Sequence, residues 1–384
     1  MLTEQRCWTM AGGWTGPLGE WSDGGWANSD ARSQLILCFG SPALINQLSW
    51  RQDLQHHYPN AVLLGCSTAG EIAGTTVHDE AVVVTIVRFE STQIKTYPLT
   101  MTAGETSLAV GEKIGQQIDP ENLAHVFVLS DGLQVNGSDL VRGIQQYLPA
   151  GVTLTGGLSG DGDRFEKTYV LLNDTLATGM IAAVGLYGDR LQVGYGSLGG
   201  WTAFGPERQI TKSTGNVLYE LDDKPALELY KSYLAEHAAD LPAAGLLFPL
   251  SLKTQSTAGL VRTILAVDET HQSMTFAGDL PEGSTAQLMH ASFDRLVDGA
   301  MQAAEISIQT LETPAELAIL ISCVGRKLVL QQRIEEEVEG VQEVLGDQSR
   351  ITGFYSYGEI APFAPGAPCE LHNQTMTITT FTER

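Results

Sequence analysis

The sequence lacks the features that mark a membrane or exported protein. No apolar run approaches the ~20 residues that a membrane-spanning helix needs, and no basic start followed by an apolar stretch opens the chain. The 5 cysteines are scattered without CxxC spacing, as is typical of reduced thiols. We therefore expect a cytoplasmic protein with no membrane partner and no metal.

Positive charge is scarce, and this scarcity excludes another class of function. The chain has 22 Lys and Arg residues against 45 Asp and Glu residues, which gives a formal net charge of −23. Such a surface repels phosphate backbones and anionic lipids. Nucleic acid is therefore not an expected partner.

Catalytic signatures are missing as well. The glycine-rich stretch 65–70 has the wrong spacing for the GxSxG nucleophile elbow, and neither GxxxxGK[ST] nor HExxH occurs. We expect that the protein is not an enzyme. The alternative is a hydrolase or transferase whose nucleophile and base no sequence pattern reveals.

What the sequence does contain is a globular composition with α/β order. It has 384 residues, 43% of them hydrophobic, which is enough for about two domains. Short apolar strands alternate with helical patterns from residue 33 onward, and closely spaced strands must pair antiparallel. We predict an α/β fold with mixed parallel and antiparallel sheets in two halves, 33–221 and 222–384. Residues 1–32, rich in Trp and Gly, are expected to form an irregular arm whose rings pack on the body.

Internal similarity is the most informative feature of the chain. Residues 65–72 and 353–360 share both glycines, the Glu and the Ile, and each copy follows a strand and a helix. Each is also followed by a histidine, His78 or His372, beside Asp or Asn. We predict internally duplicated strand–helix–strand–loop–strand units in which the two loops occupy equivalent places. A weaker echo ends in the loop 156–162.

Several side chains in these repeats suit a small ligand. Glu71 and Glu359 stand in apolar, glycine-rich surroundings, so we expect both to be buried and hydrogen-bonded, either as backbone braces or as acceptors for a ligand ammonium. Arg326 follows a strand end and suits a carboxylate, the alternative being a salt bridge to Glu335, Glu336 or Glu337. We predict a pocket between residues 323–326 and 355–359. The expected ligand-binding residues are Arg326, Glu359, Tyr355, Tyr357, Glu71, Ser67 and Thr68.

The loop 160–165 is a weaker candidate for ion binding. Asp161 and Asp163 could offer oxygen ligands to a divalent ion. The remaining ligands of a calcium loop are missing, so we expect a solvated turn.

With these motifs the chain resembles the FIST family, whose two halves are sensory domains in bacterial signal transduction. Residues 65–72 and 156–162 are similar to the N-terminal half, and residues 323–326, 353–360 and 371–375 to the C-terminal half. The resemblance implies sensing of a small ligand, with amino acids proposed. We expect no cofactor.

The resemblance also implies an alternative ligand and a signalling partner. Some relatives bind haem and respond to nitric oxide, which would need an axial ligand such as His372 or His78. Family members are often joined to output domains, and none is apparent after the last strand. We therefore expect a stand-alone sensory module that signals to a separate protein, such as a histidine kinase or a cyclic-dinucleotide enzyme.

Overall fold

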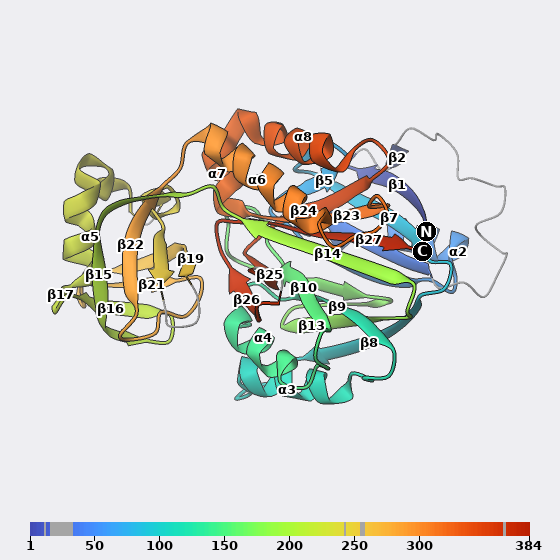
Figure 1. Cartoon of the computed structure of the whole chain (residues 1–384), viewed down its shortest axis with the longest axis horizontal. Coiled ribbons are helices and arrows are strands. Elements are labelled where there is room, and N and C mark those ends of the chain that lie inside the picture. The colour runs from blue at the N-terminus through green and yellow to red at the C-terminus, as the bar shows by residue number, and fades with distance from the viewer. Residues whose placement is uncertain (11–12, 16–33, 242, 254–257, 364–365) are drawn as a thin grey trace.

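The computed structural model describes residues 1–10, 13–15, 34–241, 243–253, 258–363 and 366–384. The predicted mixed α/β class is confirmed, with 25% of residues helical and 44% in strands. The described residues form an α/β body and a smaller β-rich subdomain beside it (Figure 1). Within those ranges, no helix is long and apolar enough to cross a membrane.

The body consists of three units with the same strand arrangement. In each unit a helical connection joins two parallel strands, a β-hairpin follows, and a last strand returns antiparallel beside the first. The parallel strands are apolar along almost their whole length because they are buried on both faces.

The elements of the three units follow one another along the chain. The first unit comprises β1 (Leu2–Thr9), β2 (Gly13–Thr15), β3 (Gln34–Gly40), α1 (Pro42–Ile45), α2 (Ser49–His57), β4 (Val62–Ser67), β5 (Glu71–Ala73), β6 (Thr76–His78) and β7 (Ala81–Arg88). The second comprises β8 (Gln93–Thr100), α3 (Ser107–Gln117), β9 (Leu123–Ser130), α4 (Gly137–Gln145), β10 (Thr153–Leu158), β11 (Val170–Leu172), β12 (Thr175–Ala177) and β13 (Met180–Tyr187). The third comprises β14 (Leu191–Leu198), α6 (Phe293–Ile308), β23 (Leu317–Cys323), α7 (Val324–Leu330), η3 (Gln331–Arg333), α8 (Ile334–Leu345), β24 (Arg350–Ser356), β25 (Gly358–Pro362), β26 (Cys369–His372) and β27 (Met376–Glu383).

Each hairpin leaves its own unit and extends the sheet of another. Hairpin β5–β6 pairs with β24 of the third unit, β11–β12 pairs with β4 of the first, and β25–β26 pairs with β10 of the second. The exchange is therefore cyclic, and the body's sheets run β12-β11-β4-β3-β7-β1-β2, β26-β25-β10-β9-β13-β8 and β14-β27-β23-β24-β5-β6. Every unit completes its sheet with a hairpin from elsewhere in the chain.

The β-rich subdomain is inserted between β14 and α6 of the third unit. It has its own hydrophobic core and lies at the left of Figure 1. The boundary predicted between residues 221 and 222 falls at the end of β16, inside this subdomain, so it does not separate two compact bodies. The subdomain comprises β15 (Thr202–Thr214), β16 (Val217–Leu221), β17 (Lys224–Pro225), α5 (Ala226–Leu234), η1 (Ala235–Asp240), η2 (Ala243–Leu246), β18 (Leu250–Lys253), β19 (Ala258–Arg262), β20 (Ile264–Asp268), β21 (Ser273–Phe276) and β22 (Thr285–His290).

The prediction of an irregular N-terminal arm is wrong for β1, which pairs with β7 along its whole length. Strand β1 is hard to recognise in the sequence because its inward positions include two charged residues. Glu4 and Arg6 are buried and form an ion pair of 2.7 Å, followed by the buried Trp8. Trp8 packs edge-on against Trp14 with ring centroids 5.2 Å apart, so these rings do pack on the body. Trp21 and Trp26 lie outside the described residues.

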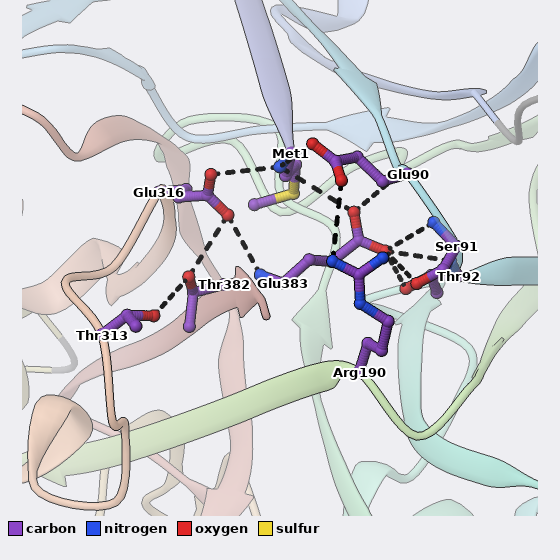
Figure 2. Close-up of polar contacts among 9 residues, drawn as sticks. All are labelled: Met1, Glu90, Ser91, Thr92, Arg190, Thr313, Glu316, Thr382 and Glu383. Carbon is purple, nitrogen blue, oxygen red and sulfur yellow. Dashed lines mark hydrogen bonds and ion pairs between the residues drawn. The ribbon is translucent and has the colours of Figure 1, made fainter.

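The last strand is tied to the first unit by one carboxylate (Figure 2). Glu383 accepts hydrogen bonds from the backbone N–H of Glu90 (2.5 Å) and Thr92 (2.9 Å) and from the Thr92 hydroxyl (2.7 Å). Burial alone would raise the pKa of Glu383, but these hydrogen bonds lower it below its usual value. The Met1 amino group lies 3.9 Å from Glu383 and 3.1 Å from Glu316, so β1, β27 and the β7–β8 turn meet at this point.

The cyclic exchange predicts that the N-terminal half does not fold alone. A fragment of residues 1–224 would leave β10 and hairpin β5–β6 without their partners β25 and β24, so edge strands would be exposed. We expect the purified fragment to show no cooperative thermal transition in circular dichroism, whereas the full chain shows one. A sharp, concentration-independent transition in the fragment would contradict this interpretation.

Candidate functional site

The candidate site is a cavity of about 670 Å³ at the carboxyl ends of strands from all three units, which we call the central cavity. Its walls are residues 41–43 after β3, 68–70 after β4, 161–167 after β10, and the start of α7. In α/β sheets ligands typically bind at such strand ends. Residues from three of the sequence motifs, 65–72, 156–162 and 323–326, therefore line one cavity.

A ring of backbone hydrogen bonds brings these loops together. In each unit, the loop after the second parallel strand donates one hydrogen bond to the end of the corresponding strand in another unit. The bonds run from Ala69 to Tyr355 (2.8 Å), from Gly160 to Ser67 (2.9 Å) and from Tyr357 to Leu158 (3.3 Å). The same closure is thus made three times around the centre of the body.

The two motifs predicted to be equivalent occupy equivalent places. Gly65 stands on β4 opposite Cys38, and Gly353 stands on β24 opposite Leu320. A Cβ atom on Gly65 would lie 2.1 Å from the Cys38 oxygen, and one on Gly353 would lie 1.9 Å from the Leu320 oxygen. Glycine is required at both positions because the parallel strands approach too closely for a side chain.

The prediction that Glu71 is buried and hydrogen-bonded is confirmed. Its carboxyl accepts from the Thr68 hydroxyl at 2.5 Å and from the backbone N–H of Ala81, the first residue of β7, at 3.2 Å. Thr68 lines the central cavity, whereas Glu71 lies behind it. Burial raises the pKa of Glu71 to about 8, although its hydrogen bonds and the charge of Lys327 act in the opposite direction.

Glu359 repeats this arrangement in the third unit, again as predicted. It accepts from the Ser356 hydroxyl at 2.8 Å and from the backbone N–H of Thr375, just before β27, at 3.2 Å. Burial raises its pKa to about 8, against the effect of the same hydrogen bonds. In the second unit Asp131, which the sequence analysis did not single out, accepts from the backbone N–H of Gly179, just before β13. The three carboxyls therefore brace equivalent strands.

Arg326 lies in the core, away from the central cavity. Its guanidinium group is fully buried, pairs with Glu337 at 2.7 Å and donates to the carbonyl oxygens of Gly199 (2.5 Å) and Leu296 (2.8 Å). The Tyr355 hydroxyl donates to the same Glu337 at 2.7 Å. The salt-bridge alternative for Arg326 is therefore the arrangement that the structure shows.

The remaining predicted ligand-binding residues divide between core and cavity. The Ser67 hydroxyl is buried and accepts from the Tyr169 N–H at 2.9 Å, while the Tyr357 hydroxyl bonds to Asp161. Of the predicted residues, only Thr68 lines the central cavity, and none lines the second cavity found between α4 and the inserted subdomain. Of the two segments predicted to bound the pocket, 323–326 and 355–359, only Val324 lines the central cavity, and the predicted side chains bond to protein groups instead.

The central cavity has charged and polar residues that the sequence analysis did not single out. The Lys327 ammonium group donates to the Ala69 oxygen at 2.7 Å and forms an ion pair with Asp79. Ser41, only 9% exposed, has a buried hydroxyl oxygen with no hydrogen-bond partner among the described residues. A buried hydroxyl without a partner is costly in a native structure. The sequence gives only weak signals for these residues: a serine just after a strand, and a lysine next to Arg326.

Asp161 braces its own loop. Its carboxylate accepts from the backbone N–H groups of Phe165 (2.9 Å), Glu166 (2.9 Å) and Lys167 (2.8 Å). Burial acts to raise the pKa of Asp161, but these hydrogen bonds lower it overall. In the part of the chain that the structure describes, no group of His, Cys, Asp and Glu side chains is arranged to hold a metal ion.

The two histidines considered as axial haem ligands, His372 and His78, contact protein groups. The His372 ring is buried, its Nε2 lies 2.9 Å from the Ala361 oxygen, and burial lowers its pKa to about 4. His78 lies 4.0 Å from the Cys7 sulfur. Neither residue lines the central cavity or the cavity beside α4.

Comparison with known proteins identifies the family. A FIST N domain matches residues 34–224 and a FIST C domain matches residues 226–362, so the chain belongs to the FIST family. FIST domains are sensory domains implicated in signal transduction. An uncharacterized protein of Methanocaldococcus jannaschii is 22% identical over 345 residues, a match that covers 80% of this chain and 65% of that relative.

The raised pKa values predict how stability depends on pH. The ordinary pKa of a Glu carboxyl is 4.5, and that of Glu71 and Glu359 in the folded protein is about 8. Between these two pH values the folded protein keeps protons on both carboxyls that the unfolded chain releases. Their contribution is therefore fully present below pH 4.5 and is lost as pH rises through 8, at about 1.4 kcal/mol per pH unit for each group. Urea unfolding from pH 5 to 8.5 measures this slope.

Glutamine imitates the protonated carboxyl, so Glu71→Gln and Glu359→Gln should each remove one group's share of the slope. The exposed Glu121→Gln is the matched control and should leave the slope as in the wild type. Equal slopes in all four proteins would show that these carboxyls are ionised in the folded state.

Proposed function

We propose that this chain is a sensory module that binds a small amino-acid-like ligand in the central cavity. The observation that carries the proposal is the buried Ser41 hydroxyl, which has no partner among the described residues and lines a cavity that also contains the Lys327–Asp79 ion pair. A volume of about 670 Å³ lies within the ~300–1,000 Å³ common for ligand pockets.

The charges of the cavity suit a zwitterion. Lys327 is 18% exposed at its side chain, whereas its partner Asp79 is 72% exposed, so the pair can open toward a ligand from the Asp79 side. A ligand carboxylate would then bind Lys327 and the Ser41 hydroxyl, and its ammonium group would bind Asp79. The ligand would replace one ion pair by two, both shielded from water.

Thr68 and Glu71 connect the cavity to the strands around it. Thr68 contributes to the cavity wall and donates to Glu71, which braces the first residue of β7 and begins the exchanged hairpin β5–β6. A ligand that moves Thr68 would therefore act on two sheets at once. In this proposal an output protein, of the histidine-kinase or cyclic-dinucleotide class, reads the resulting change.

A ligand screen with cavity variants tests this proposal. We expect at least one of the common amino acids to raise the melting temperature of the wild type, since a ligand that binds the folded state stabilises it. Lys327→Met should weaken binding in calorimetry by about 2 to 5 kcal/mol, because a ligand carboxylate would lose its counter-charge. Ser41→Ala should weaken it by about 1 kcal/mol.

Two further variants control for indirect effects. Lys327→Arg keeps the charge and should retain most of the affinity, while Lys212→Met removes an exposed lysine of the inserted subdomain and should change nothing. An amino acid that binds all these variants with wild-type affinity would place the ligand site elsewhere.

A further inference from the structure

A second cavity, of about 1030 Å³, lies between helix α4 of the second unit and the inserted subdomain, and we call it the subdomain cleft. One wall is formed by α4 and by residues 368–371, which include the start of β26. The other wall is formed by β18, β19 and residues 279–285 of the subdomain. In Figure 1, α4 and β26 lie on the side of the body next to the subdomain, and β19 lies on the side of the subdomain next to the body.

The subdomain wall contains a buried cation whose hydrogen bonds all go to neutral groups. Arg262, the last residue of β19, is 4% exposed and donates to the carbonyl oxygens of Asp279 (3.1 Å), Leu371 (2.9 Å) and Val261 (3.4 Å). Burial lowers its pKa to about 10, so it remains charged at neutral pH. Among the described residues this guanidinium group forms no ion pair within 4.0 Å, although the charges of Glu370 and Asp279 act on it from further away.

Three carboxylates among the described residues line the cleft, those of Asp279, Glu282 and Glu370, and the first two accept hydrogen bonds from other groups. The Asp279 carboxylate accepts from the Asn136 side chain at 3.1 Å, and Glu282 accepts from the Ser213 N–H at 3.0 Å. A buried charge that lacks an ionic partner is unfavourable, and an anion in the cleft would relieve this cost.

The body wall adds a second polar group and an apolar surface. Ser138, in the first turn of α4, has a buried hydroxyl oxygen with no partner among the described residues, and this end of the helix has a partial positive charge. Val141, Leu260 and Leu371 line the cleft as well. The cleft thus combines donors for an oxyanion with a surface for an apolar body.

We propose that the subdomain cleft is a second binding site, for a small organic anion with a carboxylate or phosphate head and an apolar body. The head binds Arg262 and Ser138, which belong to opposite walls, and the apolar body packs on Val141 and Leu260. Binding therefore fixes the inserted subdomain against the second unit. This site is independent of the central cavity.

The test uses 1-anilinonaphthalene-8-sulfonate, a fluorescent organic anion, titrated into the full chain. The wild type should bind it saturably, and Gln146→Trp, at an exposed position lining the cleft, should weaken binding at least tenfold by filling the space. The matched control is Gln117→Trp, which places the same side chain on the neighbouring helix α3, outside the cleft. Each variant's melting temperature is recorded, because a loosened fold binds the dye as well.

Charge and head group are tested separately. Arg262→Gln should weaken binding at least tenfold and Arg262→Lys less than that; if neither folds, the Gln146→Trp comparison decides alone. Octanoate and octyl phosphate, added as competitors, identify the preferred head by which of them displaces the dye. Dye affinity that is equal in the wild type, Gln146→Trp and Gln117→Trp, or that no competitor reduces, would overturn the proposal.

Discussion

The cyclic exchange of hairpins is the constraint on which the rest of the structure depends. A strand in the middle of a sheet satisfies its backbone groups on both sides, but β4, β10 and β24 would each have an open edge within their own unit. Each edge is covered by a hairpin from another unit, so the sheets become complete only when all three units are present. Stability is consequently a property of the whole body.

The same constraint creates the central cavity. Each exchanged hairpin follows the second parallel strand of its own unit and pairs with that of another, so the ends of these strands come together and are linked by the ring of backbone hydrogen bonds. The loops that form the cavity walls are linked by main-chain groups, and Ser41, Thr68 and Lys327 are among the residues that line it. A preorganised cavity of this kind suits recognition of a small ligand, because little ordering is needed on binding.

Buried carboxyls in the exchanged hairpins hydrogen-bond to the return strands of their own units. Glu71 is the first residue of β5 and Glu359 the second residue of β25, the strands that pair across units, and both brace the return strand of their own unit. Their raised pKa values follow from burial near few charges. Asp131 braces β13 in the same way, but its side chain is shorter and it follows β9, the first parallel strand of its unit. The repeat is therefore hard to see in the second unit's sequence.

The sequence by itself determined the α/β class, the equivalence of residues 65–72 and 353–360, and the burial of their glutamates. These follow from local patterns, since strand periodicity, glycine and an acidic residue in apolar surroundings each have a direct physical meaning. Only the tertiary structure decided which side chains reach a cavity. Arg326 and Lys327 are adjacent in α7, yet successive helical residues point about 100° apart, so one enters the core and the other faces the cavity. The exchange of hairpins was equally hidden, because pairing between distant strands depends on which edges meet in space.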